Sequence, residues 1–182
     1  MTSFDLLQPA TVGAGLLVLR LVLGLYMAAH GAQKLFGWFG GYGLDATGEF
    51  MAQLGYRPGR AFAALAAMTE VLSGLLVASG FLGPIGPALM ISVMIVAVGT
   101  VHWKSGLFAA NNGIEVPLLY ATGAAALALT GPGVYSLDAL LGLQSLVSPL
   151  YAWTALSVGV VGGIMNLVIR HPARTSTAIT SQ

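Results

Sequence analysis

The chain has 182 residues, of which 57% are hydrophobic and 7% are charged, whereas charged residues make up ~25% of an ordinary soluble domain. The net charge is +1 and no cluster of basic residues is large enough to suggest nucleic-acid binding, so we expect no nucleic-acid partner. The chain has no cysteine, which excludes disulfides, thiol redox chemistry and thiolate-ligated metal sites.

Five apolar segments follow one another along the chain, each close to the ~20 residues with which a helix spans a bilayer. Lipid offers the backbone no hydrogen bonds, so such segments form helices. No segment shows the alternating polarity over ~10 residues that a transmembrane strand needs. The predicted fold class is therefore all-α, a transmembrane helical bundle, with the lipid bilayer as its surroundings. The segments are 13–36, 61–82, 85–101, 115–130 and 149–169.

The first segment carries a ladder of basic side chains. Arg20, His30 and Lys34 fall, with Met27, in a helical sector about 80° wide. Arg20 and Lys34 are separated by ~21 Å of helix. Ionisable groups inside a span are expensive and usually face one another or a polar cavity. The first ten residues lack the basic start of a cleavable signal peptide, so we expect this span to be retained.

The second segment holds Glu70 about ten residues from its start, near the middle of the membrane. Arg20 lies at a similar distance from the outer end of its own span, so we expect an Arg20–Glu70 pair. Such a pair is either a clamp between helices or part of a polar site that relays protons or binds a head group. The preceding connection, 37–60, is aromatic and contains a short helix predicted over 45–54.

The third and fourth segments add His102 and Glu115, which we expect to cluster with His30 and Lys34 near one membrane surface. A His30–His102 pair suggests two cofactors, and we favour a quinone bonded by histidine over a haem ligated by both rings. Histidines that bond backbone carbonyls are the structural alternative. Lys34, like the loop residue Lys104, is also expected as a flanking side chain that snorkels to the surface. No motif spacing supports a metal site.

The connection 131–148 opens with a Gly-Pro-Gly stop, after which Ser136 is the expected N-cap of a short helix with Asp138 in its first turn. Small residues recur four apart in the second and fifth spans, which permits close helix packing. We expect packing within the bundle, with a homo-oligomer interface on the fifth span as the alternative. The tail 172–182 is polar and expected to be disordered.

Lysine and arginine fall on one side only of the five-span arrangement. The three connections on the opposite side contain neither residue, so the positive-inside rule places the basic side in the cytoplasm. We therefore expect a multi-pass protein of the inner (plasma) membrane with its N-terminus outside and its C-terminus cytoplasmic. The basic residues are Lys34, Arg57, Arg60, Lys104, Arg170 and Arg174.

Four ordered motifs resemble the DoxX family of small bacterial membrane proteins, over roughly 16–143. They are LRLVLG at 19–24 with HGAQKLFG at 30–37, Glu70 with the helix that follows it, VHWKSG at 101–106 leading to NNGIE at 111–115, and GPGVYSLD at 131–138. The resemblance implies a four-helix membrane domain, 1–143. The segment 144–171 is then an additional transmembrane helix.

The resemblance also implies redox work at the membrane. A related subunit is known in a thiosulfate:quinone oxidoreductase, and some actinobacterial members are linked to a sulfurtransferase and a superoxide dismutase. We therefore expect a membrane subunit of a quinone-linked oxidoreductase system, with a scaffold for soluble redox enzymes or a small-molecule or lipid transporter as alternatives. Glu70, His30 and His102 are the candidate catalytic residues. The candidate quinone-binding residues are Arg20, Lys34 and Glu115.

Overall fold

The structure, a computed structural model, describes residues 3–146 and 148–171. Its regular elements in these ranges are all helical, as the sequence predicts. The predicted disordered tail lies outside the described residues. The principal helices are α1 (Ser3–Phe36), α2 (Gly43–Gln53), α3 (Gly59–Ser79), α4 (Ile85–Ala97), α5 (Glu115–Thr130), α6 (Leu137–Leu140) and α7 (Pro149–Val168).

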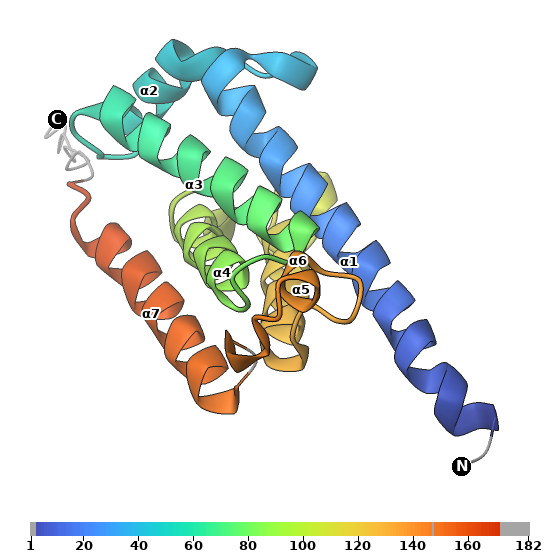
Figure 1. Ribbon diagram of the computed structural model, residues 1–182. Coiled ribbons are helices and arrows are strands. Elements are labelled where there is room, and N and C mark those ends of the chain that lie inside the picture. Colours follow the sequence, from blue (N-terminus) through green and yellow to red (C-terminus); the bar gives the residue numbers. More distant parts are fainter. Residues whose placement is uncertain (1–2, 147, 172–182) are drawn as a thin grey trace, which may run out of the picture.

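Helices α1 and α3 form an antiparallel pair with closely approaching backbones (Figure 1). A Cβ atom at Gly24 would lie 2.5 Å from the Gly74 carbonyl oxygen, and one at Gly31 would lie 2.5 Å from the Ala67 carbonyl oxygen. Small residues allow the backbones to approach this closely. Close packing of this kind stabilises helix pairs in lipid, where the hydrophobic effect does not hold helices together. These contacts fix the register of the pair: residue numbers that face each other add up to roughly one hundred.

The remaining long helices complete the bundle around α4, which packs against α3, α5 and α7 (Figure 1). The core between α1, α4 and α5 includes Met27, Met90 and Tyr120. Helix α7 approaches α4 through glycine, because a Cβ at Gly159 would lie 2.4 Å from the Ala88 carbonyl oxygen. Both predicted small-residue pairs thus serve packing within the bundle, while a homo-oligomer remains a prediction.

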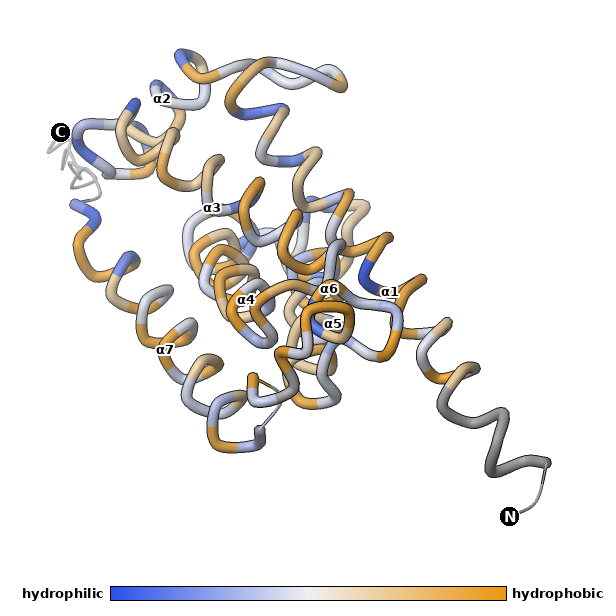
Figure 2. The backbone as a smooth tube through the Cα atoms, viewed as in Figure 1, coloured by the Kyte–Doolittle hydropathy of each residue, from blue (hydrophilic) through white to orange (hydrophobic). Residues whose placement is uncertain are grey.

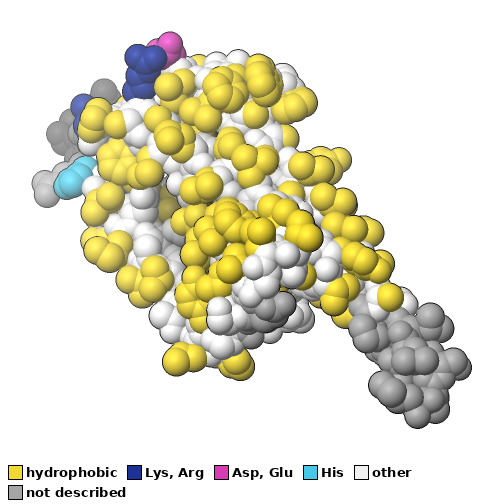
Figure 3. Space-filling model, in the orientation of Figure 1, with side chains coloured by type: hydrophobic (Ala, Val, Ile, Leu, Met, Phe, Trp, Pro, Cys, Tyr) yellow, Lys and Arg dark blue, Asp and Glu magenta, His cyan; other side chains and the backbone are white. Residues whose placement is uncertain are grey.

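Within the ranges that the structure describes, four helices are long and apolar enough to cross a membrane, namely Ala10–Phe36, Gly59–Ser79, Ile85–Ser105 and Pro149–Val168. The fourth predicted span, α5, has the predicted bounds but only 16 residues, or ~24 Å of helix. Hydrophobic residues predominate along the long helices (Figure 2), and hydrophobic side chains cover much of the face that Figure 3 shows. This is the surface expected of a multi-pass membrane protein, in which the bilayer replaces water around the helices.

Three helix ends differ from the predicted limits. Helix α1 begins ten residues earlier, at Ser3. Helix α3 stops at Ser79 because Gly80 takes the left-handed conformation (φ 65°) that favours glycine. Helix α4 continues past Ala97 as a π-helical turn, Val98–His102. The N-cap at Ser136 is confirmed, since its Oγ accepts a hydrogen bond from the Ala139 amide.

Candidate functional site

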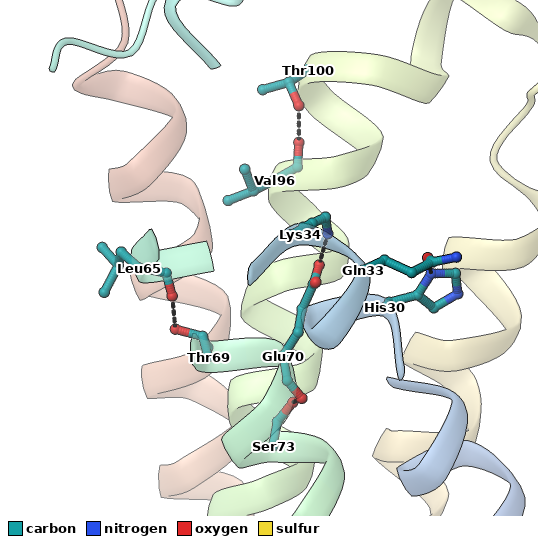
Figure 4. A network of polar contacts seen from close by, with 9 residues as sticks. All are labelled: His30, Gln33, Lys34, Leu65, Thr69, Glu70, Ser73, Val96 and Thr100. Atoms are coloured by element: carbon teal, nitrogen blue, oxygen red, sulfur yellow. Dashed lines mark hydrogen bonds and ion pairs between the residues drawn. The ribbon is translucent and has the colours of Figure 1, made fainter. Parts of the chain in front are cut away.

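A buried ion pair joins α1 to α3. The Lys34 Nζ donates to Glu70 Oε1 (Figure 4). The Glu70 side chain is 4% exposed and that of Lys34 is 32% exposed. The second carboxylate oxygen, Glu70 Oε2, is buried and has no hydrogen-bond partner in the described residues. The pair therefore combines an enclosed acid with a base that reaches the surface.

The geometry of the two helices brings these side chains together. In the α1–α3 register, Lys34 lies about one helical turn nearer the basic side than Glu70. Side chains lean toward the N-terminus of their own helix, and the two helices are antiparallel. Lys34 therefore leans into the membrane while Glu70 leans back toward the surface. The alternative in which Lys34 snorkels outward is wrong, because its ammonium group points inward to the carboxylate.

The predicted pair of Arg20 with Glu70 is not formed. Arg20 lies at the other end of α3, where its NH2 group donates to the backbone oxygen of Tyr135 and its guanidinium packs against Gly80. Glu70 and Gly80 are ten residues apart, or ~15 Å along the helix. The prediction measured depth from the first apolar residue of each span, whereas the glycine contacts set the actual register.

Arg20 is buried among backbone groups where α3 ends, and these contacts are structural. Arg20 is 2% exposed, and its cation meets the carbonyl end of α3, where the helix dipole favours positive charge. Asp138 lies close by and accepts hydrogen bonds from the amides of Leu82 (2.9 Å) and Gly83 (2.6 Å). The void beside Arg20 is about 10 Å³, which is room for one water molecule. The void that Arg20 itself lines therefore has no space for a quinone.

His30 lies near the ion pair in sequence but serves a different set of contacts. Its Nδ1 is 3.2 Å from Gln33 Oε1, and the Gln33 amide donates to the Phe39 carbonyl oxygen at 3.1 Å. Its ring meets that of Tyr120 edge-on, with centroids 6.1 Å apart. Figure 4 shows His30 and Gln33 directed away from the Lys34–Glu70 contact. His30 therefore links α1 to the 37–40 turn and to α5.

His102 and Glu115 organise the connection between α4 and α5. His102 Nδ1 lies 2.8 Å from the Asn112 carbonyl oxygen, which is the structural alternative for this residue. Glu115 Oε2 accepts the Ala109 amide at 2.8 Å. Among the described residues neither bonds to His30 or Lys34, so no hydrogen bond joins the four predicted residues into one network. The part of the chain that the structure describes contains no group of three or more metal-ligating side chains.

Two cavities flank the last turns of α1. The first, which we call the Lys34 cavity, has a volume of about 470 Å³ and lies between α1, the 37–42 turn and α2. The second has a volume of about 410 Å³ and is lined by His30, Tyr26 and Phe39. Gln33 lines both cavities. The Lys34 cavity is lined by Gln33, Lys34, Gly40, Gly41, Tyr42, Ala46, Thr47 and Phe50.

Gln33 and Thr47 were missed because neither is ionisable. Gln33 is a polar side chain inside an apolar helix, and this position was a usable signal. Thr47 is almost fully buried, and its hydroxyl bonds the Gly43 carbonyl oxygen at 2.7 Å within α2. Only the folding of α2 back over α1 turns it into a lining residue, which no local pattern predicts.

The comparisons with known proteins agree with this architecture. The family model described as DoxX matches residues 15–103, from within α1 to the end of the π-helical turn. The chain thus carries a DoxX domain over these residues, which agrees with the resemblance that the sequence motifs indicated. The match covers both partners of the Lys34–Glu70 pair and the whole of α2. A search of curated proteins and a search of solved structures each found no match.

Proposed function

We propose that this protein, with its DoxX domain, is the quinone-binding membrane subunit of a redox system and that the quinone head group occupies the Lys34 cavity. One observation carries the proposal: a buried Glu70 with a free carboxylate oxygen is joined to a cavity at the end of a span by a lysine that lines that cavity. Intramembrane ionisable pairs of this kind mark substrate and proton pathways.

The size and lining of the cavity suit an amphipathic ring. Its volume of about 470 Å³ is within the ~300–1,000 Å³ typical of small-molecule sites. Tyr42 and Phe50 offer aromatic surface, while Gln33 and Lys34 offer hydrogen-bond donors. Quinone carbonyl oxygens accept such bonds. A lipid-soluble quinone reaches this depth from the bilayer, with its tail left among the acyl chains.

In the proposed reduction of quinone, this chain supplies protons and a partner supplies electrons. Reducing a quinone to a quinol takes two electrons and two protons. Lys34 donates a hydrogen bond to a carbonyl oxygen, and Glu70 passes protons to the ring through Lys34. The chain has no cysteine and the described residues have no metal cluster, so we assign the electrons to a soluble redox enzyme that docks on the membrane. A sulfurtransferase or a superoxide dismutase is the class of partner that the family resemblance suggests.

The proposed orientation of the protein across the membrane follows from the positions of its basic residues. The end of α1, the start of α3 and the end of α7 carry the basic residues, and they lie together at one end of the bundle (Figure 1). The positive-inside rule assigns this end to the cytoplasm of a cell whose inner membrane holds the protein. The Lys34 cavity then lies at the cytoplasmic interface, where protons and a soluble partner are both available.

Photoaffinity labelling tests the proposal directly. Purified protein in nanodiscs is exposed to an azido-quinone and illuminated, and labelled peptides are mapped by mass spectrometry. We expect label on the 37–50 segment, and competition by an unlabelled quinone of the same ring. Ala46→Trp fills the cavity and keeps both members of the ion pair in the sequence, so it should abolish this label.

Ala110→Trp is the matched control. Ala110 is exposed in the α4–α5 connection and does not line the Lys34 cavity, so the same substitution there should leave labelling unchanged. Labelling of the 37–50 segment that survives Ala46→Trp would overturn the proposal. Label that maps beside Arg20 in place of the 37–50 segment would also overturn it.

A further inference from the structure

A second concave site lies on the opposite side of α3 from the Lys34 pair. Helices α3 and α7 both pack on α4, and a groove of about 190 Å³ remains between them. Figure 3 shows a hollow on this face of the molecule, and the basic and histidine side chains seen in this view lie at the upper left margin of the molecule. We call it the α3–α7 groove. Its apolar walls include Phe62, Leu65, Leu89 and Val93.

The groove contains a buried donor with nothing to bond. Tyr56 lines the groove and is 2% exposed, and its hydroxyl has no hydrogen-bond partner in the described residues. Its ring packs on Phe62 with centroids 5.0 Å apart, which holds the hydroxyl in place. An unmatched buried hydroxyl costs free energy. The position therefore favours a ligand that brings an oxygen acceptor.

The same end of the groove is positively charged. The His171 amide donates to the Gly55 carbonyl oxygen at 2.9 Å, which ties the end of α7 to the residue before Tyr56. Arg57 is exposed next to it in the chain. Burial raises the pKa of the Tyr56 hydroxyl, and the nearby charge of Arg170 acts in the opposite direction. Tyr56 thus has Arg57 next to it in the chain and the charge of Arg170 nearby.

We propose that the α3–α7 groove binds an anionic phospholipid, with one acyl chain between α3 and α7 and the phosphate between Arg57 and Arg170. The Tyr56 hydroxyl donates to a lipid oxygen. Basic pockets between spans on the cytoplasmic side are typical of sites for anionic head groups. A neutral quinone would leave both arginines without a counter-charge, which is why we assign the groove to a phospholipid. This proposal is independent of the function of the Lys34 cavity.

Native mass spectrometry of the detergent-solubilised protein with phosphatidylglycerol or phosphatidylcholine tests it. We expect tighter binding of phosphatidylglycerol and a loss of about fivefold for each of Arg57→Gln and Arg170→Gln, from the usual contribution of one basic residue near an anionic head group. Arg60→Gln is the control, because Arg60 faces α2, where its Nε pairs with Asp45 at 3.0 Å. It removes an equal charge from the same end of the protein without touching the groove.

Variants of residues that line the groove distinguish binding of the acyl chain from binding of the lipid head group. Ala66 lines the groove, so Ala66→Phe should displace both lipids, and Tyr56→Phe should weaken phosphatidylglycerol while the fold is retained. Circular dichroism and thermal unfolding confirm folding of each variant. An equal loss in Arg60→Gln, equal binding of the two lipids, or bound lipid that survives Ala66→Phe would each overturn the proposal.

Discussion

Separating the two members of the Lys34–Glu70 pair should have unequal effects on the free energy of unfolding. Lys34→Met leaves the Glu70 carboxylate, whose side chain is 4% exposed, without its counter-charge. An uncompensated buried charge costs ~3–5 kcal/mol. Glu70→Met leaves a lysine whose side chain is 32% exposed and can turn toward the cavity and the surface. That variant should lose only about 1 kcal/mol, the scale of an exposed pair.

The double variant Lys34→Met/Glu70→Met completes the cycle. It replaces a buried pair by apolar side chains of similar volume, which is often close to neutral, so it should be more stable than Lys34→Met alone. The measurement is reversible unfolding in bicelles by steric trapping, which gives free energies in a bilayer environment. Additive effects of the two single changes, or a larger loss for Glu70→Met, would refute the assignment of Glu70 as the enclosed partner.

Three further changes test the packing and the closed end of the bundle by the same assay. Gly24→Ala should lose ~1–3 kcal/mol by overpacking, because its Cβ would meet the α3 backbone at 2.5 Å, whereas Gly15→Ala, with nothing within 4 Å, should be nearly neutral. Asp138→Ala should lose ~1–3 kcal/mol by leaving two amides unsatisfied, and Asp138→Asn should lose less. Arg20→Met should lose ~1.5–3 kcal/mol with its charged hydrogen bond yet leave azido-quinone labelling unchanged, and a loss of label would reassign Arg20 to the quinone site.

Local signals in the sequence were sufficient for the helices. The apolar run from Glu115 to Thr130 was predicted with the observed bounds, because a charged residue opens it and a glycine-proline stop closes it. The Ser136 cap was equally readable, since a capping hydroxyl acts within three residues. These features depend on a few neighbouring residues, and a sequence window contains all of them.

Local sequence signals could not predict which basic residue pairs with Glu70. Glu70 was assigned to Arg20 because both looked central in their spans. Yet α1 extends to Ser3, and the contacts of Gly24 and Gly31 slide it so that Lys34 faces Glu70. A sequence shows which residues are small. It does not show which small residues of two helices meet, and a shift of two or three turns changes every partner.

The contacts of the predicted cluster of His30, Lys34, His102 and Glu115 also have a physical explanation. A polar group in a span needs a partner rather than a common centre, and nearby backbone supplies one at low entropic cost. His102 and Glu115 accordingly bond the loop that they flank, and His30 bonds a side chain one turn away. Glu70 has no such local partner for its carboxylate, so it depends on another helix. This dependence is what distinguishes the functional candidate from its ionisable neighbours.

The two charges of α1 therefore have opposite roles, although they lie on one face of one helix. Arg20 ends at a carbonyl-rich helix terminus beside a void of about 10 Å³, so it holds the 131–136 connection in place and leaves room for about one water molecule at its guanidinium. Lys34 ends between a buried acid and a cavity of about 470 Å³, so its charge can respond to what enters that cavity. A ligand that bonds one of these two charges needs space beside it. The void at Arg20 does not offer that space, which favours a ligand that enters and leaves at the Lys34 end.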